Sequence, residues 1–195
     1  MEIIKHITKK EINEYPTEKF EGKIILIDNK KHVEEAVKEI LKHDVVGLDT
    51  ESRPVFKRGQ YHHVSLIQIA IPKKVYLFRI NKTGLTDGLI QIFSTKSIMK
   101  VGVALYDDIK DLKRIRRFEH QSFVDVSHFT KPLEIVNTGA RSLAAIFLGF
   151  KISKAQQTSN WENEKLTNEQ MSYAATDAWV CLELYQKLET LGHVN

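Results

Sequence analysis

The stretch VSLIQIAIPKKVYLFRI at residues 64–80 decides the fold class of this sequence. Two runs rich in β-branched and aromatic residues, 64–71 and 75–80, are separated only by Pro72, Lys73 and Lys74. A connection this short joins only antiparallel strands, because parallel strands need a crossover of about a dozen residues or more. We therefore predict a β-hairpin over this stretch.

Shorter apolar runs before the hairpin predict further elements. KIILI at 23–27 is typical of a buried strand, and VVGLD at 45–49 is a core strand too short to be a helix. Apolar residues between Val33 and Leu41 recur at helical spacing. Since no convincing helix follows VVGLD before the hairpin, the strand at 45–49 and the two strands of the hairpin are expected to form an antiparallel meander.

Beyond the hairpin, the pattern changes to alternating strands and helices. It predicts helices near 84–94 and 107–116 and strands at 97–104 and 123–126. Thr167 and Gln170 form a capping box, which predicts a final helix from about 168 to 191. The chain is therefore expected to be an α/β domain with a mixed central sheet, antiparallel first and parallel later, flanked by helices.

Composition bounds the organisation of the chain. Its 195 residues, 42% apolar and 28% charged, fit one globular domain and exclude disorder as a whole. Residues 1–20 mix charge with isoleucines and are interrupted by Pro16, so we interpret them as an N-terminal arm. The net charge of +4, from 29 basic and 25 acidic residues, favours polyanionic partners only mildly.

The single cysteine, Cys181, excludes an intramolecular disulfide framework and any multi-cysteine metal site. Without a disulfide framework, a reducing compartment is the natural expectation. The sequence has neither a membrane-length apolar run nor a start that fits a signal peptide. We therefore expect a cytoplasmic protein with no membrane partner.

Four acids lie where solvated acids are less expected. Asp49 and Glu51 follow the apolar run VVGL, and one intervening residue on an extended chain directs both to the same face. Asp108 follows a predicted strand, and Asp177 lies one helical turn after Tyr173. Carboxylates that converge repel one another unless a cation neutralises them, and hard oxygen ligands select Mg²⁺ or Mn²⁺.

Three segments that hold these acids match a known set of motifs in order: LDTE at 48–51, VGVALYDDIKDL at 101–112 and YAATDA at 173–178. They resemble the exonuclease motifs of the DEDD 3′–5′ exonucleases, in the subtype with tyrosine in the third motif, to which ribonuclease D and the Werner syndrome exonuclease domain belong. The intervening blocks match too: SLIQIA at 65–70, RSLAAIFLG at 141–149, QQTSNWE at 156–162 and LTNEQ at 166–170. In size, the chain is similar to small stand-alone bacterial members.

The resemblance implies a ribonuclease-H-like fold, with the exonuclease domain at residues 21–192. It implies two divalent ions, Mg²⁺ or Mn²⁺, as cofactors. The metal ligands would be Asp49, Glu51, Asp108 and Asp177, and these four together with Tyr173 would be the catalytic residues. The spacing to Leu112 favours Asp108 as the acid of the second motif, and Asp107 remains the alternative.

The implied reaction is hydrolysis of phosphodiester bonds at the 3′ end of DNA or RNA, with release of nucleoside 5′-monophosphates. Two metal ions can activate water and stabilise the departing oxygen, and Tyr173 can orient the water. The expected partner is nucleic acid with a free 3′ end. By resemblance, Arg53 and Trp161 lie near the cleft, although packing is the more expected role for Trp161. Gln68 either meets a sugar or base or satisfies a backbone group.

Two other functions stay open at this stage. A nucleic-acid-binding module could keep the fold without catalysis, and the same fold could serve an endonuclease or another phosphodiesterase. The basic segment KDLKRIRR at 110–117 is either a contact for nucleic acid or a solvated helix face. No motif separates DNA from RNA, because recognition of the 2′-hydroxyl depends on the shape of the cleft.

Overall fold

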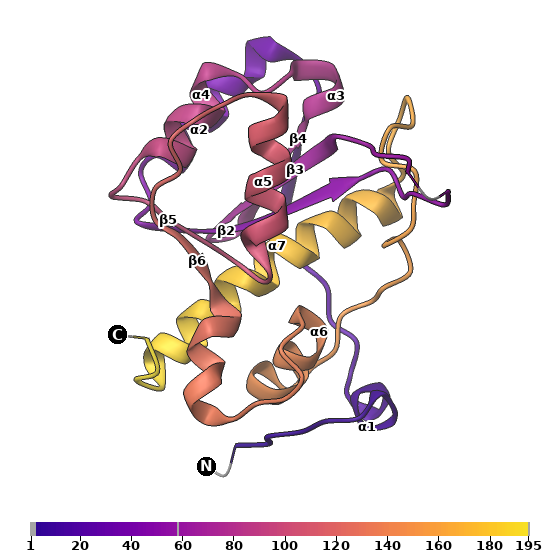
Figure 1. Cartoon of the computed structure of the whole chain (residues 1–195), viewed down its shortest axis with the longest axis vertical. Coiled ribbons are helices and arrows are strands. Elements are labelled where there is room, and N and C mark those ends of the chain that lie inside the picture. Colours follow the sequence, from indigo (N-terminus) through magenta and orange to yellow (C-terminus); the bar gives the residue numbers. More distant parts are fainter. Residues whose placement is uncertain (1–2, 58, 195) are drawn as a thin grey trace.

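A six-stranded mixed sheet forms the centre of the molecule (Figure 1). The computed structural model describes residues 3–57 and 59–194. The strand order is β1-β4-β3-β2-β5-β6. The strands are β1 (Lys23–Ile27), β2 (Val45–Ser52), β3 (Val64–Ile71), β4 (Lys74–Arg79), β5 (Met99–Gly102) and β6 (Phe123–Asp125). The pairs β2–β3 and β3–β4 are antiparallel, whereas β1–β4, β2–β5 and β5–β6 are parallel.

This topology confirms the mixed α/β sheet that the sequence predicts. The hairpin at 64–80 and its pairing with β2 form the expected antiparallel meander. The parallel pairing of β1 with β4 at the other edge was not predicted. The strand that begins with VVGLD is longer than its apolar run, because β2 continues through both carboxylates to Ser52. A register shift then occurs between Glu51 and Ser52.

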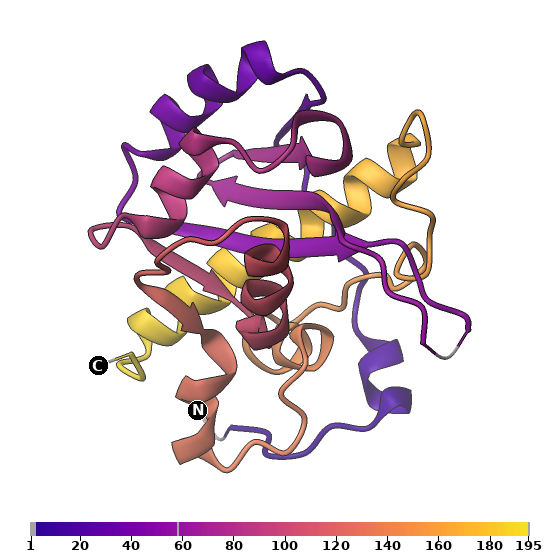
Figure 2. The ribbon, with the colours of Figure 1, turned by 45° about the horizontal axis from the view of Figure 1, so that its top comes forward.

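Helices cover both faces of the sheet. The α-helices are α1 (Lys9–Glu14), α2 (Val33–Ile40), α3 (Ile80–Thr83), α4 (Asp87–Ser94), α5 (Leu105–Ile115), α6 (Ala140–Leu143) and α7 (Asn168–Thr190). Two 3₁₀ segments, η1 (Lys30–His32) and η2 (Val126–Leu133), and a π-helical turn, η3 (Ala144–Leu148), complete the set within the described residues. In Figure 2, α7 passes behind the strands and α5 lies in front of them.

Strand β3 shows how the sequence divides the core into two layers. All eight of its residues are buried. Leu66 and Ala70 belong to the cluster that contains α7, whereas Ile67 and Ile69 pack with α2, α4 and α5. Because successive side chains of a strand point to opposite faces, a strand between two helical layers is apolar throughout.

The same alternation directs the acids of β2 toward α7. Val46 and Leu48 belong to the layer of α2, α4 and α5, so Asp49 and Glu51 point to the other face. The capping box of Thr167 and Gln170 begins α7 as predicted. This long helix packs closely on β2 at Gly47, where a Cβ atom would lie 2.1 Å from the carbonyl oxygen of Ala178.

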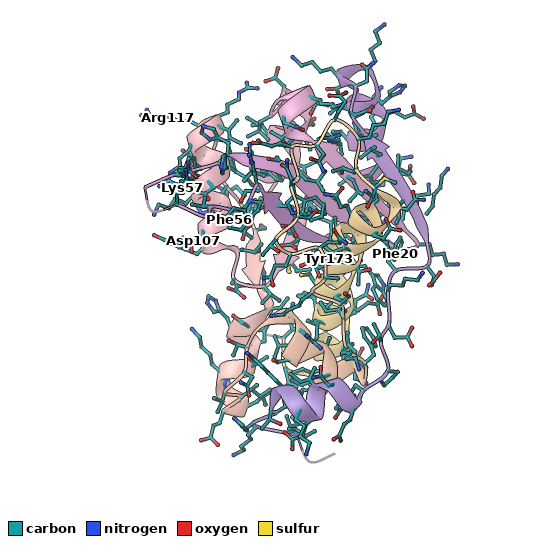
Figure 3. The ribbon with its side chains drawn as sticks, turned by 90° about the vertical axis from the view of Figure 1, so that its right-hand side faces the viewer. Phe20, Phe56, Lys57, Asp107, Arg117 and Tyr173 are labelled. Atoms are coloured by element: carbon teal, nitrogen blue, oxygen red, sulfur yellow. The ribbon has the colours of Figure 1, made fainter. Side chains whose placement is uncertain are left out.

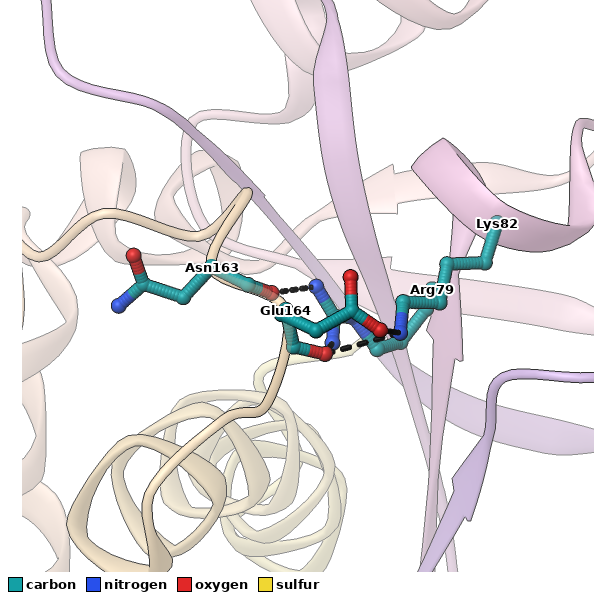
Figure 4. Close-up of polar contacts among 4 residues, drawn as sticks. All are labelled: Arg79, Lys82, Asn163 and Glu164. Carbon is teal, nitrogen blue, oxygen red and sulfur yellow. Dashed lines mark hydrogen bonds and ion pairs between the residues drawn. The ribbon is translucent and has the colours of Figure 1, made fainter.

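Hydrogen bonds join the loop that precedes α7 to the end of β4 (Figure 4). Arg79, at the end of β4, is buried and donates hydrogen bonds to the carbonyl oxygens of Asn163 and Glu164. Lys82 adds an ion pair of 2.8 Å with the Glu164 carboxylate. These contacts hold the loop that carries Trp161 against the sheet.

The N-terminal arm lies against the η3 region, and its division from the domain at residue 20 stays a prediction. Ile7 and Ile12 form a small buried cluster with Ala145. A β-bridge joins Thr17 to Lys151. Across the described part of the chain, no helix combines the length and the apolar character needed to cross a membrane.

The close contact between β2 and α7 predicts the effect of a small substitution. Gly47→Ala should lower the free energy of unfolding by at least about 2 kcal/mol, because the added methyl group collides with backbone that cannot move independently. Urea denaturation followed by circular dichroism measures the change. The matched control is Gly139→Ala, where a Cβ atom meets nothing within 4 Å. Equal stability of the two variants would contradict the packing argument.

Candidate active site

Three carboxylates from two distant segments meet beside the centre of the sheet. Asp49 and Glu51 come from β2, and Asp177 comes from α7. One carboxylate oxygen from each of the three lies within 4.8 Å of the others. The i, i+2 spacing on the strand aligns the first two acids, and the packing of α7 on β2 supplies the third.

The electrostatics of this cluster are unfavourable without a counter-charge. Burial and the charges of Asp177, Glu51 and Asp108 raise the pKa of Asp49. Burial, then Asp177 and Asp108, raises the pKa of Glu51 to about 9. Burial raises the pKa of Asp177 to about 7, although the Tyr173 hydroxyl and Lys154 oppose the rise. A divalent cation fits this set, because it neutralises the repulsion and its preferred ligands are carboxylate oxygens.

Asp108 lies outside the three converging carboxylates, but its charge acts on Asp49 and Glu51. It lies in the first turn of α5, and its carboxylate accepts a hydrogen bond from the hydroxyl of Thr50. Burial raises the pKa of Asp108 and the Thr50 bond opposes the rise. Asp107 is exposed and is labelled at the edge of the molecule in Figure 3. The geometry therefore favours Asp108 over Asp107 as the fourth acid.

Tyr173 lies one turn before Asp177 on α7 and lines the same cavity. Burial, followed by the charges of Asp177 and Glu51, raises the pKa of its hydroxyl. Its ring packs against Trp161, with 6.0 Å between ring centroids. The tyrosine is therefore held as a neutral hydrogen-bonding group next to the carboxylates.

The cavity over the carboxylates has a volume of about 370 Å³. Its wall includes Asp49, Glu51, Tyr173 and Asp177, together with basic and polar groups from residues 139–157. A cavity lined by both acidic and basic groups can hold a cation and a phosphate together. A larger cavity of about 670 Å³ adjoins it, and Tyr173 and Ser153 line both.

Comparison with known proteins places this arrangement in a family. A family model described as a 3′-5′ exonuclease matches residues 24–192. The chain belongs to the 3′–5′ exonuclease family. The expected class of enzyme and the resemblance to the DEDD exonucleases are thereby confirmed. The tyrosine subtype and the small bacterial form stay predictions.

Relatives and solved structures agree with this assignment. Over 155 residues, this chain is 37% identical to the bifunctional 3′-5′ exonuclease/ATP-dependent helicase WRN of Mus musculus. The match covers 76% of this chain and 11% of that protein. The exonuclease mut-7 homolog of Aedes aegypti is 28% identical over 203 residues, covering 90% of this chain and 28% of its own length. The chain therefore spans only a small part of these relatives.

Solved structures support the fold. The Nibbler EXO domain of Aedes aegypti superposes with a TM-score of 0.78 at 24% identity, covering 88% of this chain and 90% of that one. Escherichia coli RNase D gives a TM-score of 0.74 at 22% identity and covers 87% of this chain and 46% of that one. The ribonuclease-H-like architecture is confirmed.

The three residues expected to bind substrate lie off the cavity wall. Trp161 is fully buried and supports the Tyr173 ring. Gln68 is fully buried beside Asp49 in the sheet register, and its amide atoms have no hydrogen-bond partner among the described residues. Arg53 is exposed and forms an ion pair of 3.4 Å with Glu162. A role for any of them in substrate binding therefore stays a prediction.

Sequence reasoning missed the basic wall of the cavity. Arg141 and Lys154, which we call the basic wall, line it together with the polar Gln157. Arg141 and Gln157 lie inside the blocks RSLAAIFLG and QQTSNWE, which resemble the family, but nothing in the local pattern distinguishes them from surface residues. Only the fold of the segment 139–157 over the carboxylates brings these side chains to the site.

The raised pKa values predict how metal-free stability depends on pH. In the folded state, Glu51 and Asp177 stay protonated above about pH 4, where the same groups in the unfolded chain lose their protons. The folded state then binds more protons than the unfolded state, so the free energy of unfolding falls as pH rises toward 9. Urea denaturation in EDTA should show a loss of more than about 1 kcal/mol between pH 5 and pH 9.

A variant that cannot ionise provides the control for this pH dependence. Glu51→Gln should flatten the decline, because the amide carries no proton to release. Added Mg²⁺ should recover stability at pH 9, since it binds only the folded, ionised cluster. A wild-type stability that stays level from pH 5 to pH 9 in EDTA would contradict the burial of these acids.

Proposed function

We propose that this chain is a metal-dependent 3′–5′ exonuclease. It would hydrolyse the phosphodiester bond at the 3′ end of DNA or RNA and release a nucleoside 5′-monophosphate. The observation that carries the proposal is the meeting of Asp49, Glu51 and Asp177 in a cavity of a chain that belongs to this family. The cytoplasm is the location proposed for it.

The carboxylates would hold the metal cofactor. Asp49, Glu51 and Asp177 offer converging oxygens, and Asp108 supplies a fourth carboxylate beside Thr50. Two bound divalent ions, Mg²⁺ or Mn²⁺, would activate the attacking water and neutralise charge on the departing 3′-oxygen. Without the carboxylates in their ionised form, the site cannot bind such ions.

Tyr173 would position the water by hydrogen bonding. Its raised pKa keeps the hydroxyl protonated at neutral pH, so it donates or accepts a hydrogen bond and does not act as a strong base. The packing of Trp161 against the ring restricts its movement. A fixed hydroxyl lowers the entropic cost of aligning water with the phosphorus atom.

The basic wall would bind the phosphate that is cut. Lys154 is close enough to Asp177 to lower the pKa of that acid, so its ammonium lies within the field of the carboxylates. The guanidinium of Arg141 donates to the side chain of Asn13 at 2.8 Å, and its Nε has no partner among the described residues. Both cations could therefore contact non-bridging phosphate oxygens that face away from the acids.

The proposed activity is tested with 5′-labelled single strands of DNA and RNA of the same sequence. With Mg²⁺ or Mn²⁺, we expect the strands to shorten stepwise from the 3′ end, whereas a circular strand stays intact. Asp49→Asn should lower the rate at least about 100-fold without changing the fold, because it removes a central ligand charge. Binding without shortening by folded, metal-loaded protein would instead indicate a silent binding module.

Two adjacent acids on α5 provide a matched pair of variants. Asp108→Asn should lower exonuclease activity about 100-fold or more, because its carboxylate lies beside the cluster. Asp107→Asn makes the same chemical change on an exposed side chain and should retain activity within about twofold. The rates on a 5′-labelled oligonucleotide measure both, and the reverse ranking would assign the second motif to Asp107.

A further inference from the structure

A groove on the outer side of α5 is lined mainly by cations. Its volume is about 580 Å³, and its wall consists of Lys110, Lys113, Arg114, Arg117, Phe118 and Glu119. Lys110, Lys113 and Arg114 are spaced i, i+3 and i+4 along α5, and Arg117 follows just beyond the end of the helix at Ile115. We call these four cations the α5 track.

Among the described residues, three of the four cations of the α5 track form no ion pair. Arg114 forms an ion pair of 2.7 Å with Asp111, and the Lys113 ammonium lies 2.9 Å from the ring of His120. Within residues 3–57 and 59–194, Lys110 and Arg117 form no ion pair. A solvated helix face is usually balanced by nearby acids, so this surplus favours an anionic partner.

The α5 track connects to the candidate active site by two routes. Along the axis of α5, Arg114 is offset from Asp108 by about 9 Å, given a rise of about 1.5 Å per residue. Across the surface, Arg114 also lines a second groove that contains Glu162. Glu162 pairs with Arg53, which is two residues beyond Glu51. A strand that leaves the carboxylates can therefore follow basic groups onto α5.

Aromatic rings border the same surface. The guanidinium of Arg114 lies 4.7 Å from the ring centroid of Tyr61, in the loop between β2 and β3. Phe56 of that loop is 81% exposed, and Tyr106 of α5 is 78% exposed. Figure 3 shows Phe56, Lys57 and Arg117 on one side of the molecule. Exposed rings beside cations can stack bases while the cations contact phosphates.

We propose that the α5 track and the rings of Phe56 and Tyr61 bind the single-stranded segment that precedes the 3′ end. The inference rests on the proposed function, because it takes the occupant of the track as the upstream part of the substrate. Phosphates would contact Lys110 and Arg117, and unpaired bases would stack on the rings. The combination of cations with exposed rings favours a single strand, because a duplex keeps its bases stacked inside.

The test measures binding of a fluorescein-labelled DNA strand of about 20 nucleotides, longer than a typical single-strand site. EDTA prevents cleavage, and anisotropy is recorded at several salt concentrations. Lys110→Ala combined with Arg117→Ala should raise Kd on the order of tenfold near 0.1 M salt. The slope of log K against log salt should fall by about 1.4, since each lost phosphate contact contributes about 0.7.

A double variant elsewhere on the surface is the matched control. Lys30→Ala combined with Lys31→Ala removes the same charge from exposed positions of η1 and should change Kd less than about twofold. Phe56→Ala should weaken binding roughly tenfold and leave the salt slope unchanged, because stacking releases no counterions. The proposal is overturned if both lysine-containing double variants weaken binding equally, or if the α5 variant binds like the wild type.

The proposed catalysis is measured separately, as hydrolysis of the p-nitrophenyl ester of thymidine 5′-monophosphate. This ester reaches the carboxylates but is too short for the α5 track. If wild-type protein with Mn²⁺ does not hydrolyse it, the catalytic proposal fails while the binding comparison still decides the role of the track. If the ester is hydrolysed but the α5 variant binds long strands normally, only the inference about the track fails.

Discussion

The close packing of α7 on β2 is the constraint on which the site depends. Gly47 lets the backbone of α7 approach so closely that any larger residue would meet the carbonyl oxygen of Ala178. This approach carries Asp177, the residue before Ala178, to the acids of β2. The capping box at Thr167 fixes the residue at which α7 begins. A shift of one residue would turn Asp177 away by about 100°.

Bringing the acids together stores electrostatic repulsion in the fold. Burial raises the pKa values of Asp49, Glu51 and Asp177, which means that the metal-free cluster resists ionisation. The two apolar layers on either side of β3 offset this cost, because their burial does not depend on the state of the acids. Such repulsion is typical of functional sites, where charged groups are held in an unfavourable arrangement and the stability of the surrounding core offsets the cost.

The charge distribution complements this acidic centre. The chain has a net charge of only +4, yet three acids gather in one cavity, while cations line the same cavity and the α5 track. Tyr173 lines the same cavity, and Trp161 packs against its ring. A metal-filled cluster would leave the surrounding surface distinctly basic, which suits a polyanionic strand that enters by one end.

Local pattern was enough to predict the strands, the final helix and the common face of Asp49 and Glu51, because alternation and capping act within a few residues. Together with the family motifs, it also named Asp177 and Tyr173 as candidates. Only tertiary packing decided that Asp108 contacts Thr50 while Asp107 is exposed, that Trp161 is buried, and that Arg141 and Lys154 line one cavity with the acids. These facts depend on contacts between residues that are far apart in sequence, and periodicity carries no information about such distances.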